Sequence, residues 1–485
     1  MATVTRSKKS CTVNPLKMSQ PIGGALAFLG LNRCMPVLHG SQGCTAFGLV
    51  VFVRHFREAI PLQTTAMNEA TTIMGGFDNI EQAILNIHKR TQPEIIGICS
   101  TGLTETKGDD VDGYLKRIRS RHPELAEVAM VYVSTPDYQH AFQDGWGKTV
   151  AHIVTELAEA VTAPDPVTGR TSAASRASNS ARGPRLDPIA EPAAVKQLRR
   201  INILPGSHLM PADIEELREI VEAFGFDPIV LPDLSGSLDG HVPDDFSPTT
   251  VGGTSLADIR ATGGASLTIA VGEQMRIAAE ALQAKAGVPY ELFERLTGLE
   301  ANDRLLALLA RLSGQPVPNK YRRQRSQLVD AMLDGHFFFG GKKIAIGAEP
   351  DLLWGIGSWL AEMGAEISAA VTTTDSPLLE KLPVKEVVIG DLEDLEARAA
   401  GCDLLITHAH GRQMAERLDL PFVRMGLPTF DRLGAAHRLM VGYRGTRDLI
   451  FEIGNVFLAN EHHNTPATWA RVGDEFHVRA PATAH

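Results

Sequence analysis

Residues 35–57 read MPVLHGSQGCTAFGLVVFVRHFR, and this stretch decides the class of fold. The apolar residues 35–38 are typical of a short buried strand, and residues 45–57 carry apolar side chains at helical spacing. The glycine-rich loop between them predicts a strand that passes directly into a helix. Cys44 then lies in the first turn of that helix, where free backbone N–H groups and the helix dipole favour a thiolate.

The same alternation of strand and helix continues along the chain. In the first third, strand signals at residues 35–38, 60–64, 94–99 and 129–134 alternate with helical spacing at 45–57, 79–89, 109–121 and 148–160. Later strand signals at 201–204, 228–231, 342–347, 366–371, 385–389 and 403–407 alternate with helical segments at 211–224, 322–334, 351–363 and 443–460. This alternation predicts doubly wound, Rossmann-like α/β domains with mostly parallel sheets.

We divide the chain into three such domains. Residues 1–161 form the first and hold the Cys44 motif, residues 196–337 form the second, and residues 338–485 form the third with a C-terminal helix. Residues 162–195 are rich in Ser, Ala and Pro and nearly lack large apolar side chains, so we predict a disordered linker there. Ligands of such folds bind at the carboxyl ends of strands, which is where residues 39–44 lie.

Composition narrows the possible partners. The chain has 485 residues, 44% of them hydrophobic and 21% charged, which is ordinary for a globular protein. Its net charge of -10 argues against nucleic acid or anionic lipid as a partner, because both require a basic face. The few unpaired cysteines indicate a reducing compartment, and no apolar run is long enough to cross a bilayer, so we expect a cytoplasmic protein.

The cysteine count limits what kind of site Cys44 can form. The chain has 5 cysteines, Cys11, Cys34, Cys44, Cys99 and Cys402, with no C-x-x-C pair. An iron–sulfur cube normally takes four thiolates, and structural zinc takes four N or S ligands with close pairs. If Cys44 binds a cluster, either distant cysteines converge on it or a second polypeptide supplies the other ligands.

Other motifs favour structural roles. Cys34, Cys99 and Cys402 lie in or beside apolar strands and read as packing residues, and the pair His408 and His410 reads as a solvated or core loop without further ligands nearby. No Walker motif, complete dinucleotide fingerprint or Gly-x-Ser-x-Gly elbow is present, so nucleotide binding and serine hydrolysis have no support.

Several longer motifs resemble one family. They are residues 14–24 (NPLKMSQPIGG), 36–44 (PVLHGSQGC), 54–58 (RHFRE), 75–76 (GG), 108–110 (GDD), 424–432 (RMGLPTFDR) and 442–445 (GYRG). Together they are similar to the β-type subunit of nitrogenase component 1 and cover nearly the whole chain except the linker. The chain departs from the catalytic β subunit at two positions. Of the three cysteines that hold the P-cluster in that subunit, only Cys44 is matched, and Ser19 and Gly102 stand at the other two.

The resemblance with these two losses implies a cofactor-assembly scaffold of the same family. It implies that Cys44 gives the fourth thiolate to a [4Fe–4S] cluster whose other three ligands come from an α-like partner, NifE, within a heterotetramer. It further implies that the complex receives an iron–sulfur precursor of the iron–molybdenum cofactor from NifB or a cluster carrier, and that NifE mainly holds this precursor. The nitrogenase Fe protein would act during maturation, and apo-component 1 would accept the product. We expect no independent catalytic residue.

Two other interpretations remain open from the sequence. The chain could be a catalytic β-type subunit, either of nitrogenase component 1 or of the related light-independent protochlorophyllide reductase. Without the resemblance, it could be a cluster-free α/β ligand-binding protein in which Cys44 only packs.

Overall fold

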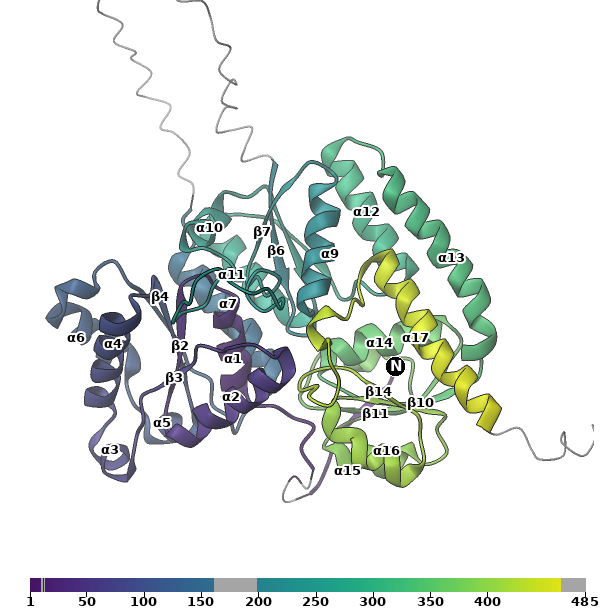
Figure 1. The fold of residues 1–485 in the computed structure, drawn as a ribbon, viewed down its shortest axis with the longest axis horizontal. Coiled ribbons are helices and arrows are strands. Elements are labelled where there is room, and N and C mark those ends of the chain that lie inside the picture. The colour runs from purple at the N-terminus through teal and green to yellow at the C-terminus, as the bar shows by residue number, and fades with distance from the viewer. Residues whose placement is uncertain (10–11, 13, 161–198, 464–485) are drawn as a thin grey trace, which may run out of the picture.

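The computed structural model describes residues 1–9, 12, 14–160 and 199–463. The described chain forms three parallel β-sheets flanked by helices (Figure 1). The predicted linker at residues 162–195 lies outside the described residues. The doubly wound α/β fold class is confirmed, since the sheets are parallel throughout and follow strand orders with crossovers.

The first sheet has the order β3-β2-β4-β5 and contains the Cys44 motif at the end of β2. Its strands are β2 (Cys34–His39), β3 (Gln63–Thr64), β4 (Ile95–Ser100) and β5 (Ala129–Val133). Its helices are α1 (Gln20–Leu29), α2 (Gln42–Phe56), α3 (Glu69–Met74), α4 (Phe77–Thr91), α5 (Gly102–Lys107), α6 (Val111–Arg121) and α7 (Phe142–Leu157), with a short 3-10 turn, Pro123–Leu125.

Helix α1 is buried along its whole length and packs against α7. Two glycines allow the close approach. A Cβ on Gly23 would lie 1.9 Å from the carbonyl oxygen of Phe142, and one on Gly145 would lie 2.1 Å from that of Gln20. Side chains at either position would force the helices apart, so the pair holds the centre of the first unit rigidly.

The second sheet has the order β7-β6-β8-β9. Its strands are β6 (Arg200–Pro205), β7 (Asp227–Val230), β8 (Leu267–Val271) and β9 (Tyr290–Phe293). The helices that follow in this part of the chain are α9 (Pro211–Glu222), α10 (Leu256–Ala261), α11 (Arg276–Ala286), α12 (Leu299–Ser313) and α13 (Asn319–Phe339).

The third sheet has the order β1-β12-β11-β10-β13-β14. Its strands are β1 (Thr3–Arg6), β10 (Lys343–Gly347), β11 (Glu366–Thr372), β12 (Glu386–Ile389), β13 (Leu404–Thr407) and β14 (Phe422–Arg424). Its helices are α14 (Pro350–Glu362), α15 (Leu392–Ala399), α16 (Arg412–Leu418) and α17 (Gly442–His463). Strand β1 pairs in parallel with β12, so the start of the chain lies in this sheet although we assigned it by sequence order to the first domain. The domain boundaries stay a proposal.

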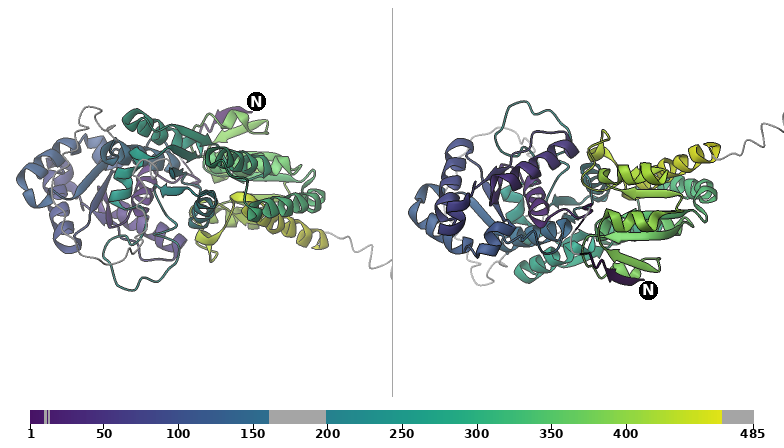
Figure 2. Two further views of the ribbon diagram at one scale, coloured as in Figure 1. Left: turned by 90° about the horizontal axis from the view of Figure 1, so that it is seen from above. Right: turned by 90° about the horizontal axis from the view of Figure 1, so that it is seen from below.

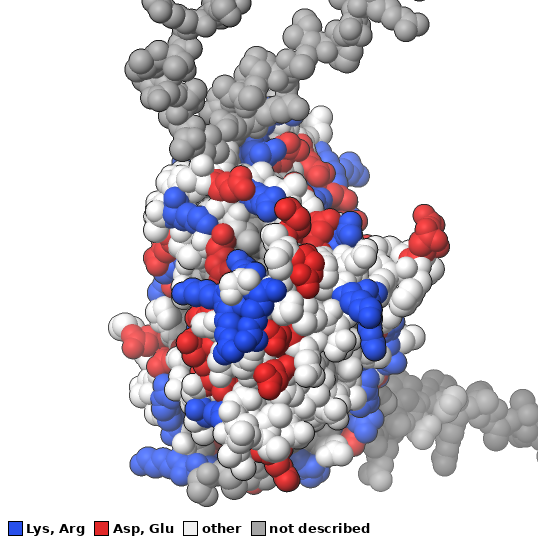
Figure 3. Space-filling view, turned by 90° about the vertical axis from the view of Figure 1, so that its left-hand side faces the viewer, with Lys and Arg blue, Asp and Glu red and all other residues white. Residues whose placement is uncertain are grey.

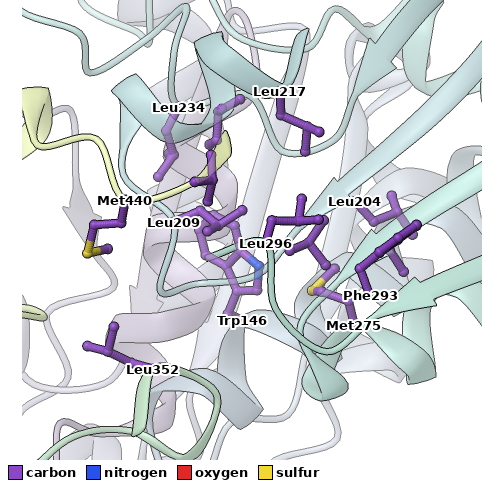
Figure 4. Packing of buried hydrophobic residues seen from close by; sticks show 14 of the residues in the cluster. Trp146, Leu204, Leu209, Leu217, Leu234, Met275, Phe293, Leu296, Leu352 and Met440 are labelled. Atoms are coloured by element: carbon purple, nitrogen blue, oxygen red, sulfur yellow. The ribbon is translucent and has the colours of Figure 1, made fainter. Parts of the chain in front are cut away.

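The second sheet lies between the ends of the elongated molecule, with the first unit at one end and the third at the other (Figures 1 and 2). Buried side chains from all three parts meet at the junction, among them Trp146, Leu209, Leu352 and Met440 (Figure 4). Trp146 is fully buried and its indole N–H donates to the carbonyl of Pro205, 3.0 Å away. Helices α13 and α17 pack along each other on the outer side. Among the described helices, none combines the length and apolar content needed to cross a membrane.

Candidate functional site

The carboxyl ends of β2 and β4 lie side by side, with His39 opposite Ser100. The hydroxyls of Thr101 and Thr104 both donate to the carbonyl of His39, at 3.0 and 3.1 Å. A Cβ on Gly40 would lie 2.2 Å from the Thr101 hydroxyl oxygen, so only glycine fits there. These contacts place the start of α2 next to the start of α5, at the sheet edge where ligands of such folds bind.

Cys44 is the third residue of α2 and is partly exposed. Its sulfur lies 3.6 Å from the hydroxyl oxygen of Ser41, the residue that precedes the helix. A Cβ on the neighbouring Gly43 would meet nothing closer than 3.9 Å, so the space beside Cys44 is open. A thiolate in a helix first turn with a bare glycine beside it suits a bulky inorganic ligand.

Ser19 and Gly102 also lie at helix starts. Ser19 caps α1, and Gly102 is the first residue of α5. The loop after β5 lies beside both helix starts, because the side-chain amide of Gln20, the residue after Ser19, donates to the carbonyl of Pro136 at 2.8 Å and a Cβ on Gly102 would lie 1.9 Å from Asp137 Oδ1. The Asp137 carboxylate therefore fills the space that a cysteine at position 102 would use.

A buried contact between a histidine and an aspartate supports the loop that carries Cys44. His39 Nε2 lies 3.5 Å from Asp109 Oδ2, and both side chains are almost fully buried. His39 Nδ1 lies 2.9 Å from the Thr65 hydroxyl. Burial lowers the pKa of His39 to about 4, against the opposing attraction of Asp109, so the imidazole is neutral near pH 7. Sequence reasoning missed this pair because 70 residues separate its members.

Gly76 packs against His39 and Asp109, and its replacement should destabilise the fold. A Cβ there would lie 2.7 Å from both Asp109 Oδ2 and His39 Cε1. We expect Gly76→Ala to lower the free energy of unfolding by about 1–3 kcal/mol through overpacking. The matched control is Gly43→Ala, where the space is open and helix propensity adds up to about 1 kcal/mol of stability. Urea unfolding measures both, and equal stabilities of the two variants would contradict this packing argument.

The family motifs at residues 54–58 and 424–432 contact each other. The backbone N–H of Thr429 donates to His55 Nδ1 at 2.9 Å, and Arg57 donates to the carbonyl of Phe430 at 2.8 Å. The Arg54 guanidinium lies 4.1 Å from the centre of the Phe430 ring. Helix α2, which carries Cys44 in its first turn, is thus bonded at its other end to the third unit.

The remaining cysteines do not join Cys44. Cys34 and Cys99 are buried in β2 and β4, and burial raises the pKa of both thiols, that of Cys99 to about 12. Cys402 packs in a separate core of the third unit, and Cys11 lies outside the described residues. The prediction that Cys34, Cys99 and Cys402 are packing residues is confirmed. Within the described ranges, no group of three or more His, Cys, Asp or Glu side chains could hold a metal ion.

His408 and His410 also behave as predicted for a structural loop. His408 is buried with Nε2 at 3.1 Å from the carbonyl of Leu16, and burial lowers its pKa to about 4. His410 is half-buried and lies beside the Phe430 ring. No carboxylate or thiolate of the described chain completes a metal site with them.

One feature of the site was missed from the sequence. The apolar face of α2, formed by Phe47, Val50 and Val53, is exposed by 56, 53 and 41% and begins one turn after Cys44. Ile73 and Met74 on α3 are also exposed, by 79 and 85%. Large apolar side chains exposed together along one helix face, as on α2, are typical of a surface that contacts another macromolecule. The sequence signal that could have indicated this exposed face was that apolar side chains occur on more than one side of α2.

Comparisons with known proteins agree on one family. Residues 19–458 match the model of the nitrogenase component 1 type oxidoreductases. The chain is 56% identical to the nitrogenase iron–molybdenum cofactor biosynthesis protein NifN of Bradyrhizobium diazoefficiens, covering 97% of this chain and 95% of that protein. It is 50% identical to the NifN protein of a Nostoc species, covering 95% and 96%.

A solved structure gives the same result for the fold. The structure described as nitrogenase Cp1 at pH 6.5 aligns with a TM-score of 0.82 and 31% identity, over 94% of this chain and 96% of that chain. The chain therefore belongs to the nitrogenase component 1 type oxidoreductase family, and within it to the NifN proteins of iron–molybdenum cofactor biosynthesis.

Proposed function

We propose that this chain is the β-like subunit of a two-chain scaffold on which the nitrogenase iron–molybdenum cofactor is matured. In this proposal Cys44 supplies one thiolate to a [4Fe–4S] cluster, and the α-like subunit, NifE, supplies the other three. The observation that carries the proposal is Cys44, the single accessible cysteine among the described residues, beside the exposed apolar face of α2. This chain offers one of the four thiolates that a [4Fe–4S] cluster needs, next to a surface suited to protein contact. That arrangement fits a cluster shared between two chains.

The residues around Cys44 have separate tasks in this proposal. The Cys44 thiolate binds the cluster from the first turn of α2, and Gly43 leaves room for it. The Ser41 hydroxyl lies within hydrogen-bond distance of the sulfur and can donate to it. The apolar face of α2 excludes water once the partner covers it. When bound, the cluster would supply one-electron transfer, and no further step needs a residue of this chain.

The catalytic β-subunit alternative has less support. A P-type cluster would need thiolates at positions 19 and 102, and Asp137 fills the space next to Gly102. The curated relatives at 46–56% identity carry a biosynthetic name. We therefore assign this chain a role in assembly and no independent activity.

The wider partners follow from the same proposal. NifB or a cluster carrier delivers the iron–sulfur precursor, which NifE mainly holds, and the nitrogenase Fe protein acts during maturation. Apo-component 1 receives the finished cofactor. Two copies of each subunit form the heterotetramer, and all of these steps are placed in the cytoplasm.

Metal analysis of the chain alone and with NifE tests the proposal. We expect little stable iron or sulfide on the isolated chain, and a [4Fe–4S] signal in electron paramagnetic resonance of the reduced complex. A complete, tightly held cluster on the isolated chain would refute the shared site. Robust acetylene reduction by the complex with Fe protein, ATP and reductant, or an eight-iron cluster at the interface, would favour the catalytic alternative.

A further inference from the structure

A pocket that is separate from the Cys44 site lies between the C-terminal end of α2 and the third unit. It encloses about 400 Å³, and its lining includes Arg54, His410, Arg412, Phe430 and Asp431. Its size is near the lower end of small-molecule sites, which span roughly 300–1,000 Å³. Two arginines and one carboxylate are the charged side chains of the lining, so it carries a positive balance although the whole chain has a net charge of -10.

Arg54 is one of the two arginines that line this pocket. Among the described residues, no carboxylate forms an ion pair with it, while its guanidinium stacks over Phe430 at 4.1 Å from the ring centre. Stacking fixes the plane of the guanidinium and leaves its N–H groups free to donate at the edge. An ordered donor of this kind loses little entropy when it binds an anion.

The other charges leave the pocket positive. Asp431 is the one carboxylate in the lining. Its Oδ2 accepts two hydrogen bonds of 2.9 and 3.1 Å from Arg424, which offset part of its charge, while its buried Oδ1 has no hydrogen-bond partner within the described chain. Arg412 has only a loose contact with Glu416, at 3.6 Å and with both side chains mostly exposed, and such contacts are weak. Arg412 therefore remains available to a ligand.

His410 adds a further donor from the third unit. Its ring centre lies 5.3 Å from that of Phe430, so the guanidinium of Arg54 and the imidazole flank one aromatic side chain. Burial and the nearby Arg54 lower the pKa of His410, so a bound anion would be needed to favour its charged form. The pocket thus joins two units of the fold around one group of nitrogen donors.

We propose that this pocket binds a small divalent anion, held by the guanidinium groups of Arg54 and Arg412 with His410. A phosphate-type oxyanion and a short dicarboxylate share the required chemistry, since both present paired oxygens to a guanidinium fork. This inference is independent of the cluster at Cys44.

Calorimetric titration of the iron-free full-length chain tests the proposal, with inorganic phosphate and succinate as separate probes at low ionic strength. We expect saturable one-site binding of at least one probe, and competition between the probes shows which source of oxygens fits better. We expect Arg54→Gln to weaken that binding by about tenfold or more, as for loss of a charge-assisted hydrogen-bond pair.

Arg117→Gln is the matched control. Arg117 on α6 is also exposed, stacks on an aromatic ring (Phe77, at 4.4 Å) and has no ion-pair partner within the described chain, but it does not line this pocket. It comes from the end of the molecule shown in Figure 3, where Lys and Arg side chains gather on the surface. We expect its variant to bind like the wild type.

Three results would overturn the proposal. They are the absence of saturable binding of either probe, unchanged affinity in Arg54→Gln, and equal weakening in Arg117→Gln. Thermal unfolding of each variant confirms that the fold is kept. Because the titration uses iron-free chain, its failure would leave the assignment of Cys44 untouched, and failure of the iron analysis would leave this pocket untouched.

Discussion

Replacing Cys44 by alanine should remove most of the iron of the shared cluster from the complex with NifE. The sulfur is the one accessible thiol in the described part of the chain, and no group of three or more His, Cys, Asp or Glu side chains there could hold a metal ion without it. Loss of an outer partner of a metal ligand already costs roughly 10–100-fold in affinity, so loss of the ligand itself should cost at least as much. Iron and sulfide analysis with electron paramagnetic resonance measures the effect.

Cys402→Ala is the control for the loss of a thiol. Cys402 is buried in a core of the third unit, and its variant should keep the iron content of the wild type. The Cys44 variant should also keep its fold, because Cys44 is partly exposed at a helix start. Unchanged iron in Cys44→Ala, or equal loss in both variants, would contradict the ligand assignment.

Much of the fold follows from local pattern, because each buried parallel strand is a short apolar run. Strands β2, β4, β5, β6, β10 and β13 lie within one or two residues of the predicted segments. Helix α1 was missed because all ten of its residues are buried, and a helix that is apolar on every side has no amphipathic period. Strand β1 was missed because TVTR is short and mostly polar, and its partner β12 is about 380 residues away.

The candidate site also has local features that the sequence predicts and tertiary features that it does not. Cys44 could be found from its position at a helix start, which is a local property. The pairing of His39 with Asp109, and the narrow space at Gly76 between them, depend on tertiary contacts that spacing does not encode. The exposure of Phe47, Val50 and Val53 could not be predicted from the sequence, since it is decided by what else packs on α2. The significance of Ser19 and Gly102 came from the family resemblance alone.

The largest loss of stability is expected where the first two units meet. Trp146 on α7 is fully buried, lies among the apolar side chains of the junction (Figure 4), and donates its indole N–H to Pro205 at the end of β6. Trp146→Ala removes this bond and leaves a cavity in a dense core. We expect it to lower the free energy of unfolding by about 3–5 kcal/mol, measured as a lower urea midpoint of the first transition.

Trp146→Phe separates the two causes of that loss. Phenylalanine keeps much of the ring volume but leaves the buried carbonyl of Pro205 without its donor, which costs about 1–3 kcal/mol. The phenylalanine variant should therefore unfold at a urea concentration between those of the wild type and the alanine variant. Equal midpoints for the two variants would assign the whole effect to the hydrogen bond, and a wild-type midpoint for Trp146→Ala would show that the junction does not depend on this side chain. Since Cys44 and Pro205 lie on different units, a weakened junction should lower the thermal stability of the complex before it lowers the iron content, which separates a structural defect from the loss of a ligand.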